Sequence, residues 1–287
     1  MGKKERIKNK EEVTGYKYGS TVELSNAVSG SPVMKKINKD EMVNRYTGEV
    51  VNIEHSVSRD DVKNKESLRF TFKNLRRLIG ANFEGGNNEL WITLTYRLND
   101  GKPMRNATKL FTDFRLLVRK LRRFLKKELS YIAVIEPQGN GAFHLHVLLK
   151  TIDKSVLFIA NNKLAKLWGQ GFVNVRRLKD SDNVANYVMA YLTNIDLNNL
   201  DGSFENKDNK SKKIVKGGRL GLYPRHFQIY RTSRNIVKPL KVKGKASSIK
   251  KDLGLSENDE PEFFRTFEIN RGEKSLKITS EFYTVKK

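Results

Sequence analysis

The stretch FHLHVLL at residues 143–149 constrains the fold more than any other, because it places two histidines inside an apolar run. Such a run predicts a β-strand, whose side chains alternate between its two faces, so His144 and His146 share one face and Leu145 lies on the other. Two imidazoles with this spacing can bind one cation. The alternative is a strand with two half-exposed histidines and no ligand. Only four histidines occur in the 287 residues, which favours the metal-binding interpretation.

A third candidate ligand lies in the preceding segment. Residues 131–136 predict a strand, and residues 137–141 (PQGNG) predict a turn. Two strands joined this closely predict an antiparallel hairpin, in which Glu136 lies across from His144 with its side chain on the same face. The alternative is that Glu136 is a carboxylate in water at the hairpin end, but its fit to a three-ligand site favours ligation. Mixed nitrogen and oxygen ligands suit Mg²⁺ or Mn²⁺.

The order of the elements predicts the fold class. Apolar and β-branched runs predict strands, and amphipathic segments predict helices. The predicted strands cover residues 90–96, 131–136, 143–149 and 172–178, and the predicted helices between them cover 107–128 and 155–168. The order strand, helix, strand, strand, helix, strand is typical of the ferredoxin-like split βαββαβ arrangement. This is an α+β fold with an antiparallel sheet and helices on one face.

The predicted helix at 107–128 combines an apolar stripe with a basic remainder. Apolar residues at spacings of four and three form the stripe, which packs on the core. The cationic residues that occupy much of the remainder are Arg115, Arg119, Arg122, Arg123, Lys126 and Lys127. Their surface is either solvated or faces phosphate groups, and the sequence favours neither. The segment 67–82 predicts a further helix with one apolar face and basic flanks.

The charge of the chain indicates a polyanionic partner. Lys and Arg number 56 and Asp and Glu 32, which gives a formal net charge of +24. Nucleic acid is the first candidate, and the alternative is a soluble basic protein without such a partner. Residues 210–251 contain no acidic residue and mix cations with aromatic rings, a pattern that suits a nucleic-acid strand. The candidate DNA-binding residues are Arg176, Lys179, Arg219, Tyr223, Arg225, Arg231 and Arg234.

The chain contains no cysteine, which excludes disulfides, thiolate metal sites and a cysteine nucleophile. The first residues, MGKKER, lead into polar sequence, so no secretory signal is expected. No apolar run approaches the length of a membrane span. We therefore expect a cytoplasmic protein without a membrane partner.

Three motifs, taken in order, resemble those of HUH endonucleases. They are LTY at 94–96 at the end of a strand, FHLH at 143–146 on a central strand, and YVMAY at 187–191 within a predicted helix at 182–194. More narrowly, the chain resembles rolling-circle replication initiator proteins of bacterial plasmids, phages and integrative elements. Tyr187 and Tyr191 are four residues apart and share one helical face, a spacing that packed core tyrosines also show.

The resemblance implies a metal-dependent endonuclease and strand transferase that acts on single-stranded DNA at an origin. In such proteins a tyrosine joins the 5′-phosphate, and the free 3′-hydroxyl primes rolling-circle synthesis. Carried over to this chain, His144 and His146 are metal ligands and Glu136 is the third. Tyr187 takes the position of the nucleophile, and Tyr191 that of the second tyrosine in two-tyrosine members.

The chain departs from the family pattern around its second tyrosine. The family often has lysines immediately before this tyrosine and three residues after it, where this chain has Ala190 and Asn194. A lysine there would stabilise a phenolate or hold a phosphate. Three explanations stay open: another cation such as Arg176 or Lys179 substitutes, activity is low, or only one tyrosine is used.

The resulting organisation has a polar N-terminal arm at 1–66, an HUH endonuclease domain at 67–200 and a basic DNA-binding extension at 201–287. The expected partner is single-stranded or hairpin origin DNA. No Walker-type nucleotide-binding motif occurs, so we expect a separate host helicase and polymerase. The alternatives are a relaxase or transposase with the same chemistry, and a non-catalytic protein that binds single-stranded nucleic acid.

Overall fold

The computed structural model describes residues 6–27, 34–53, 62–138, 140–178, 223, 227–271 and 274–285. The chain forms two compact units, one from Met1–Ser56 together with Pro239–Lys287 and the other from Val57–Lys238. The predicted helix at 182–194 lies outside the described residues. Among the described helices, none has both the length and the apolar character needed to cross a membrane.

The larger unit is built on a five-stranded antiparallel sheet. Its strands are β6 (Glu89–Leu94), β7 (Leu129–Pro137), β8 (Phe143–Thr151), β9 (Val173–Arg177) and β10 (Tyr230–Thr232), in the order β10-β7-β8-β6-β9. The four strands predicted from sequence are all present, and β10 adds an unpredicted edge. The α+β class and the antiparallel pairing are thus confirmed.

Two helices connect the strands of this sheet. Helix α2 (Ala107–Leu125) follows β6, and its first turn is capped by Asn106, whose side chain accepts a hydrogen bond from the backbone of Lys109 at 3.0 Å. It ends earlier than the predicted residue 128, because Lys126 takes a left-handed conformation with φ of 53°.

Helix α3 (Asn161–Trp168) begins six residues later than the predicted start at 155. The preceding residues are not helical, and buried Leu157 and Ile159 alternate with exposed Phe158. This alternation of period two belongs to extended backbone, and it overrides the helical spacing of the apolar residues around it.

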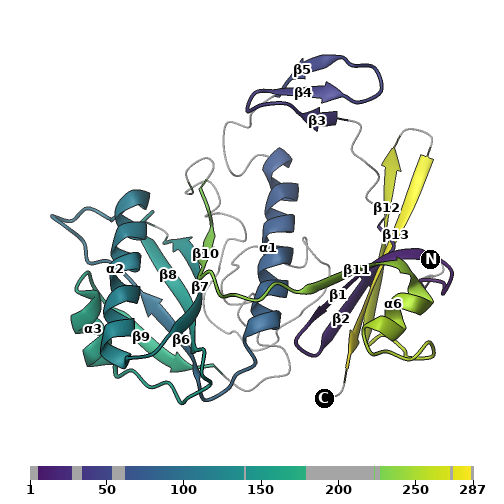
Figure 1. Ribbon diagram of the computed structural model, residues 1–287. Coiled ribbons are helices and arrows are strands. Elements are labelled where there is room, and N and C mark those ends of the chain that lie inside the picture. Colours follow the sequence, from purple (N-terminus) through teal and green to yellow (C-terminus); the bar gives the residue numbers. More distant parts are fainter. Residues whose placement is uncertain are drawn as a thin grey trace, which may run out of the picture. The chain divides into compact units, whose positions relative to one another are not determined.

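The sheet is covered on both faces (Figure 1). Leu117 of α2 and Leu164 of α3 pack in one cluster with Leu145 of β8. On the opposite face, Leu75 of helix α1 (Val62–Asn82) packs in a second cluster with Leu148. The two connecting helices therefore share one face as predicted, but α1 lies on the other face, which also carries the histidines.

Gly171 fixes the end of β6 against the loop before β9. The backbone N–H of Thr95 donates to Phe172 at 2.9 Å, and that of Arg97 donates to Gln170 at 2.9 Å. A Cβ added to Gly171 would lie 2.6 Å from backbone atoms of Thr95 and Arg97. Only glycine therefore fits between these two backbone segments.

We expect Gly171→Ala to lower the free energy of unfolding by at least about 3 kcal/mol, the upper range for an overpacked core, because backbone atoms cannot rotate aside. Urea denaturation followed by circular dichroism measures this loss. Asn162→Ala, at an exposed position of α3, is the control and should change stability by less than about 0.5 kcal/mol. Equal stability of the two variants would contradict the close packing at Gly171.

The smaller unit contains a second five-stranded sheet with strands from both ends of the chain. Its strands, in spatial order, are β11 (Leu240–Lys245), β1 (Glu12–Tyr18), β2 (Thr21–Ser25), β13 (Lys274–Thr284) and β12 (Phe263–Arg271). Helix α6 (Ala246–Asp252) packs on it through Ile249, in a cluster with Val22 and Leu24. Strands β3 (Met34–Lys36), β4 (Glu41–Asn44) and β5 (Val50–Asn52) form a separate small sheet.

Strands from the N-terminal and C-terminal segments of the chain pair with each other in one sheet. Residues 1–66 and 201–287 were predicted as separate segments, yet β1 pairs with β11, and β2 pairs with β13. The sequence does not reveal this arrangement because strands more than 200 residues apart carry no local pattern that selects their partner.

Candidate metal centre

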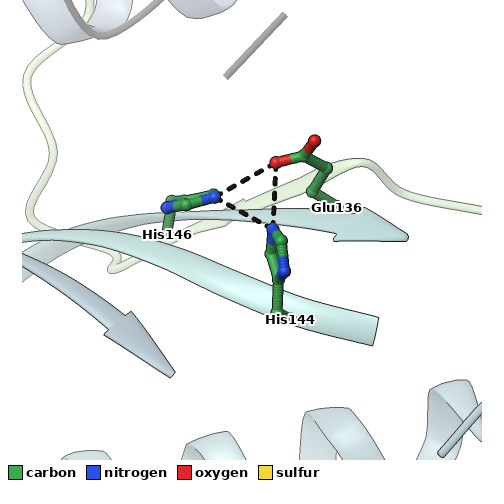
Figure 2. Close-up of side chains that lie close together, drawn as sticks. All are labelled: Glu136, His144 and His146. Atoms are coloured by element: carbon green, nitrogen blue, oxygen red, sulfur yellow. Dashed lines mark hydrogen bonds and ion pairs between the residues drawn. The ribbon is translucent and has the colours of Figure 1, made fainter. Parts of the chain in front are cut away.

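The β7–β8 hairpin brings three candidate ligands together. Glu136 on β7 pairs directly with His144 on β8, as the turn length predicted, and His146 follows two residues further on the same face. Figure 2 shows the three side chains converging above the hairpin. Glu136 Oε2 lies 2.9 Å from His144 Nε2 and 3.1 Å from His146 Nε2, and the two Nε2 atoms are 3.0 Å apart.

These spacings fit a cation with octahedral ligands. Adjacent ligands in an octahedron with bonds of about 2.1 Å lie about 3.0 Å apart. Tetrahedral ligands with bonds of about 2.0 Å lie further apart, at about 3.3 Å. The three side chains keep between 6% and 12% of their surface exposed, so protein encloses most of the site.

The ionisation of the site also fits a cation. Burial alone would raise the pKa of Glu136, but its hydrogen bonds and charge interactions with His144 and His146 lower this pKa to about 2. Burial lowers the pKa of His146, and this outweighs the opposing interaction with Glu136. At neutral pH Glu136 is therefore a carboxylate and His146 is neutral, the forms that bind metal.

Residues of β6 surround the second nitrogen of His146. His146 Nδ1 lies 3.3 Å from Thr93 Oγ1 and 3.4 Å from Trp91 Nε1. The Trp91 N–H donates to Nδ1 as the structure stands. If Nε2 held a cation, the neutral ring would carry its proton on Nδ1, which would then donate to Thr93 Oγ1 in place of accepting from Trp91. Alternation along the strand predicted at 90–96 puts Trp91 and Thr93 on one face, but their contact with His146 depends on the β6–β8 pairing.

The Nδ1 atom of His144 is buried and has no hydrogen-bond partner in the described part of the chain. A buried ring nitrogen without a partner is unusual in a site that is otherwise paired. The other ring nitrogen, Nε2, lies close to Glu136 Oε2 and His146 Nε2. This arrangement orients His144 toward the candidate cation position.

The candidate DNA-binding residues are divided between the two faces of the sheet. Arg176 of β9 pairs directly with Trp91 of β6, so their side chains share the face of the sheet that carries the histidines. Arg176 is exposed. Arg231 pairs with Ala133 and lies on the opposite face, with its guanidinium 3.8 Å from the ring centre of Phe111 on α2. Arg234 is exposed, and the remaining candidates Tyr187, Tyr191, Lys179, Arg219 and Arg225 lie outside the described residues.

Aromatic residues of the acid-free segment are packed in the structure. Tyr223 is half-buried, and its hydroxyl donates to the backbone carbonyl of Ile135 at 2.7 Å. Phe227 is buried, and its ring stacks on Phe143 with centroids 5.2 Å apart. Phe227 therefore belongs to the core, although the sequence pattern had suggested base stacking for the aromatics of this segment. The apolar neighbours of Phe227 come from distant parts of the sequence and gave no local signal.

The comparisons with known proteins agree with the position of this site. The family model of the replication-associated protein ORF2/G2P matches residues 89–196, a segment that begins at β6 and includes all three candidate ligands. A search of curated proteins and a search of solved structures each returned no significant match. Residues 89–196 are thus similar to the replication-associated protein ORF2/G2P family, a family of rolling-circle replication initiators.

Proposed function

We propose that this chain initiates replication by cutting one DNA strand at an origin in a cation-assisted attack by a tyrosine. The observation that carries the proposal is the convergence of Glu136, His144 and His146 within the family-matched segment. A replication-associated segment with a divalent-cation site favours phosphodiester chemistry. We propose Mg²⁺ or Mn²⁺ as the cation, because the ligands mix imidazole with carboxylate and their spacing is compatible with an octahedral ion.

The proposed fold is the ferredoxin-like split βαββαβ arrangement. The segment from β6 to β9 has the element order strand, helix, strand, strand, helix, strand, and its strands lie in the order β7-β8-β6-β9. This order supports the proposal because it places β8, with both histidines, at the centre of the sheet. We propose 67–200 as the endonuclease domain.

The proposed reaction is a transesterification at phosphorus. The Tyr187 hydroxyl loses its proton, and its oxygen attacks the phosphate of the scissile linkage. The bond from phosphorus to the 3′-oxygen breaks, and that oxygen takes a proton from solvent water, which has received the proton of the phenol, to become a free 3′-hydroxyl. The 5′-phosphate stays esterified to Tyr187, so the energy of the bond is kept and the step is reversible. A cation held by the three ligands supplies charge stabilisation for the phosphate oxygens.

Attack by the phenol requires a cation nearby that favours the phenolate. Ala190 and Asn194 stand where related proteins often have lysine. Arg176 lies on the histidine-bearing face of β9, two strands from β8, which corresponds to about 10 Å across the sheet. This distance suits a contact with the DNA backbone near the site, so Arg176 and Lys179 are the proposed substitutes. Tyr191 is proposed as the second nucleophile.

The test of the proposed function is a covalent product. The full-length protein is incubated with labelled single-stranded oligonucleotides that tile both strands of the DNA flanking the gene, with Mn²⁺ or with a chelator. We expect one oligonucleotide to give a protein–DNA band that survives denaturation, together with a fragment ending in a 3′-hydroxyl. The chelator should abolish both products, because the phosphate charge is then left uncompensated.

The same assay separates the alternative functions. A non-catalytic single-strand binder would shift the oligonucleotides in a native gel and leave no band after denaturation, and that result would overturn the proposal. A relaxase or transposase would give the same covalent band. Replication of a circular template in an extract that supplies host helicase and polymerase distinguishes the initiator. A cytoplasmic location follows from these proposed partners.

A further inference from the structure

The outer face of α2 carries a row of arginines on the side of the sheet away from the metal centre. Leu110, Phe114, Leu117 and Leu121 form the buried side of this helix. Arg115, Arg119 and Arg123 are exposed on the remaining surface, at spacings of four residues that align them along the helix. Together with Arg231 of β10 they are called the arginine face below.

Arg231 joins this row through Phe111. Its guanidinium lies 3.8 Å from the ring centre of Phe111, and Phe111 precedes Arg115 by one helical turn. Both residues sit on the face of the sheet that α2 covers, since Arg231 pairs with Ala133 of the same cluster. An edge strand and a helix thus contribute to one cationic surface.

In the part of the chain that the structure describes, acidic residues do not neutralise the arginine face. Asp113, the only carboxylate in α2, accepts a hydrogen bond from Tyr96 at 3.1 Å and pairs with Lys109 at 2.7 Å. Helix α3 contains no acidic residue and exposes Lys163 and Lys166 beside α2. Within the described residues, no ion pair involves Arg115, Arg119 or Arg123. Their charge is available for an external partner.

The dimensions of the row fit duplex DNA. From Arg115 to Arg123 the helix rises about 12 Å. Duplex DNA presents about one phosphate charge per 1.7 Å of its axis, so this length faces about seven charges on the two strands. Guanidinium groups on a rigid helix are oriented in advance and bind phosphate through two hydrogen bonds each.

The aromatic rings of α2 argue against a single strand on this surface. Single-stranded DNA binds largely by stacking its bases on exposed rings. The ring of Phe111 is covered by Arg231, and that of Phe124 has Lys163 Nζ at 4.5 Å from its centre. Phe114, the remaining ring, is buried. The two rings of α2 that stay partly exposed, Phe111 and Phe124, are thus each faced by a cation, which favours phosphate contacts over base stacking on this surface.

We propose that the arginine face is a second DNA-binding surface that holds the phosphate backbone of duplex DNA, separate from the strand at the metal centre. The inference goes beyond the proposed function, because duplex binding does not require cutting. The two surfaces lie on opposite faces of one sheet, as Leu145 packs under α2 and the flanking His144 and His146 point away from it.

The test measures duplex affinity of the full-length protein against salt. The probe is a blunt duplex of about 20 base pairs with arbitrary sequence, because phosphate contacts carry no sequence information. The triple variant Arg115→Gln, Arg119→Gln, Arg123→Gln removes three charges from the arginine face. The control Lys35→Gln, Lys36→Gln, Lys39→Gln removes three exposed charges from the small sheet of the other unit.

We expect the arginine variant to bind duplex at least about 10-fold more weakly at low salt, with the slope of log affinity against log salt reduced by about 2 to 3. The lysine control should change affinity less than about 3-fold, as expected from net charge alone. The covalent product with single-stranded DNA should be unchanged in the arginine variant. A Lys replacement at the same three positions, which keeps the charge, should restore most of the affinity.

Two results would overturn the proposal. Equal weakening in both triple variants would mean that duplex binding follows overall charge. Loss of the single-stranded product along with duplex affinity, in a variant with unchanged thermal midpoint, would mean that the arginine face serves the strand at the metal centre. Failure of the proposed function would leave the duplex measurement unaffected, since that measurement involves no cleavage.

Discussion

Replacing Tyr187 with phenylalanine is expected to abolish the covalent protein–DNA product. The change removes one hydroxyl, so the aromatic ring is kept while the attacking oxygen is lost. The position follows from motif order within the family-matched segment, which extends to residue 196. Denaturing gels with labelled single-stranded DNA measure the product, and we expect no band above background. Native gels should show that Tyr187→Phe binds the same DNA as the unchanged protein.

Tyr191→Phe is the matched control for this prediction. The two tyrosines are four residues apart in the sequence, which predicts one helical face, so the two variants carry the same chemical change at neighbouring positions. We expect Tyr191→Phe to retain the first covalent product and to lose a second strand-transfer step. If Tyr191→Phe alone removes the first product, the assignment of Tyr187 as nucleophile is wrong.

Replacing Glu136 with glutamine is expected to weaken Mn²⁺ binding by at least about 100-fold, more than the typical loss from an outer residue that only orients a ligand. The amide keeps the size of the carboxylate but removes the charge that offsets the cation. The same loss is expected for His146→Ala, which deletes one ligand nitrogen. Isothermal titration of the full-length protein with MnCl₂ measures both affinities, and the covalent product should fall in parallel.

Glu128→Gln provides the control for the metal prediction. Glu128 is an exposed carboxylate just before β7, and it pairs with Arg122 at 3.5 Å outside the candidate centre. It should bind Mn²⁺ like the unchanged protein, and Tyr187→Phe should do so too. Unaltered affinity in both Glu136→Gln and His146→Ala would show that the cation binds elsewhere.

The local features of this chain were predictable because their causes are local. A turn at 137–141 fixes the hairpin register, and alternation then places Glu136, His144 and His146 on one face. The apolar stripe of α2 predicted its buried side in the same way. The sequence therefore allowed the strand register that brings the three ligands together to be predicted residue by residue.

The features that sequence did not predict depend on contacts between distant segments. Tyr230 of β10 pairs with Val134 of β7 across almost 100 residues, and no turn sets this pairing. Phe227 looked like part of a basic, aromatic DNA-binding segment until that pairing placed it in the core. Helix α1 was predicted as an amphipathic element, but its apolar stripe does not indicate which face of the sheet it covers.

The short loop between β7 and β8 makes the candidate centre sensitive to a single inserted residue. Its three ligands all lie between positions 136 and 146, so closing one small loop assembles the whole set early and at low entropic cost. An added residue within 138–142 that entered the strand pairing would shift β8 by one residue against β7 and turn both imidazoles toward the helices α2 and α3. The length of this loop thus helps to determine whether the three ligands can meet around one cation.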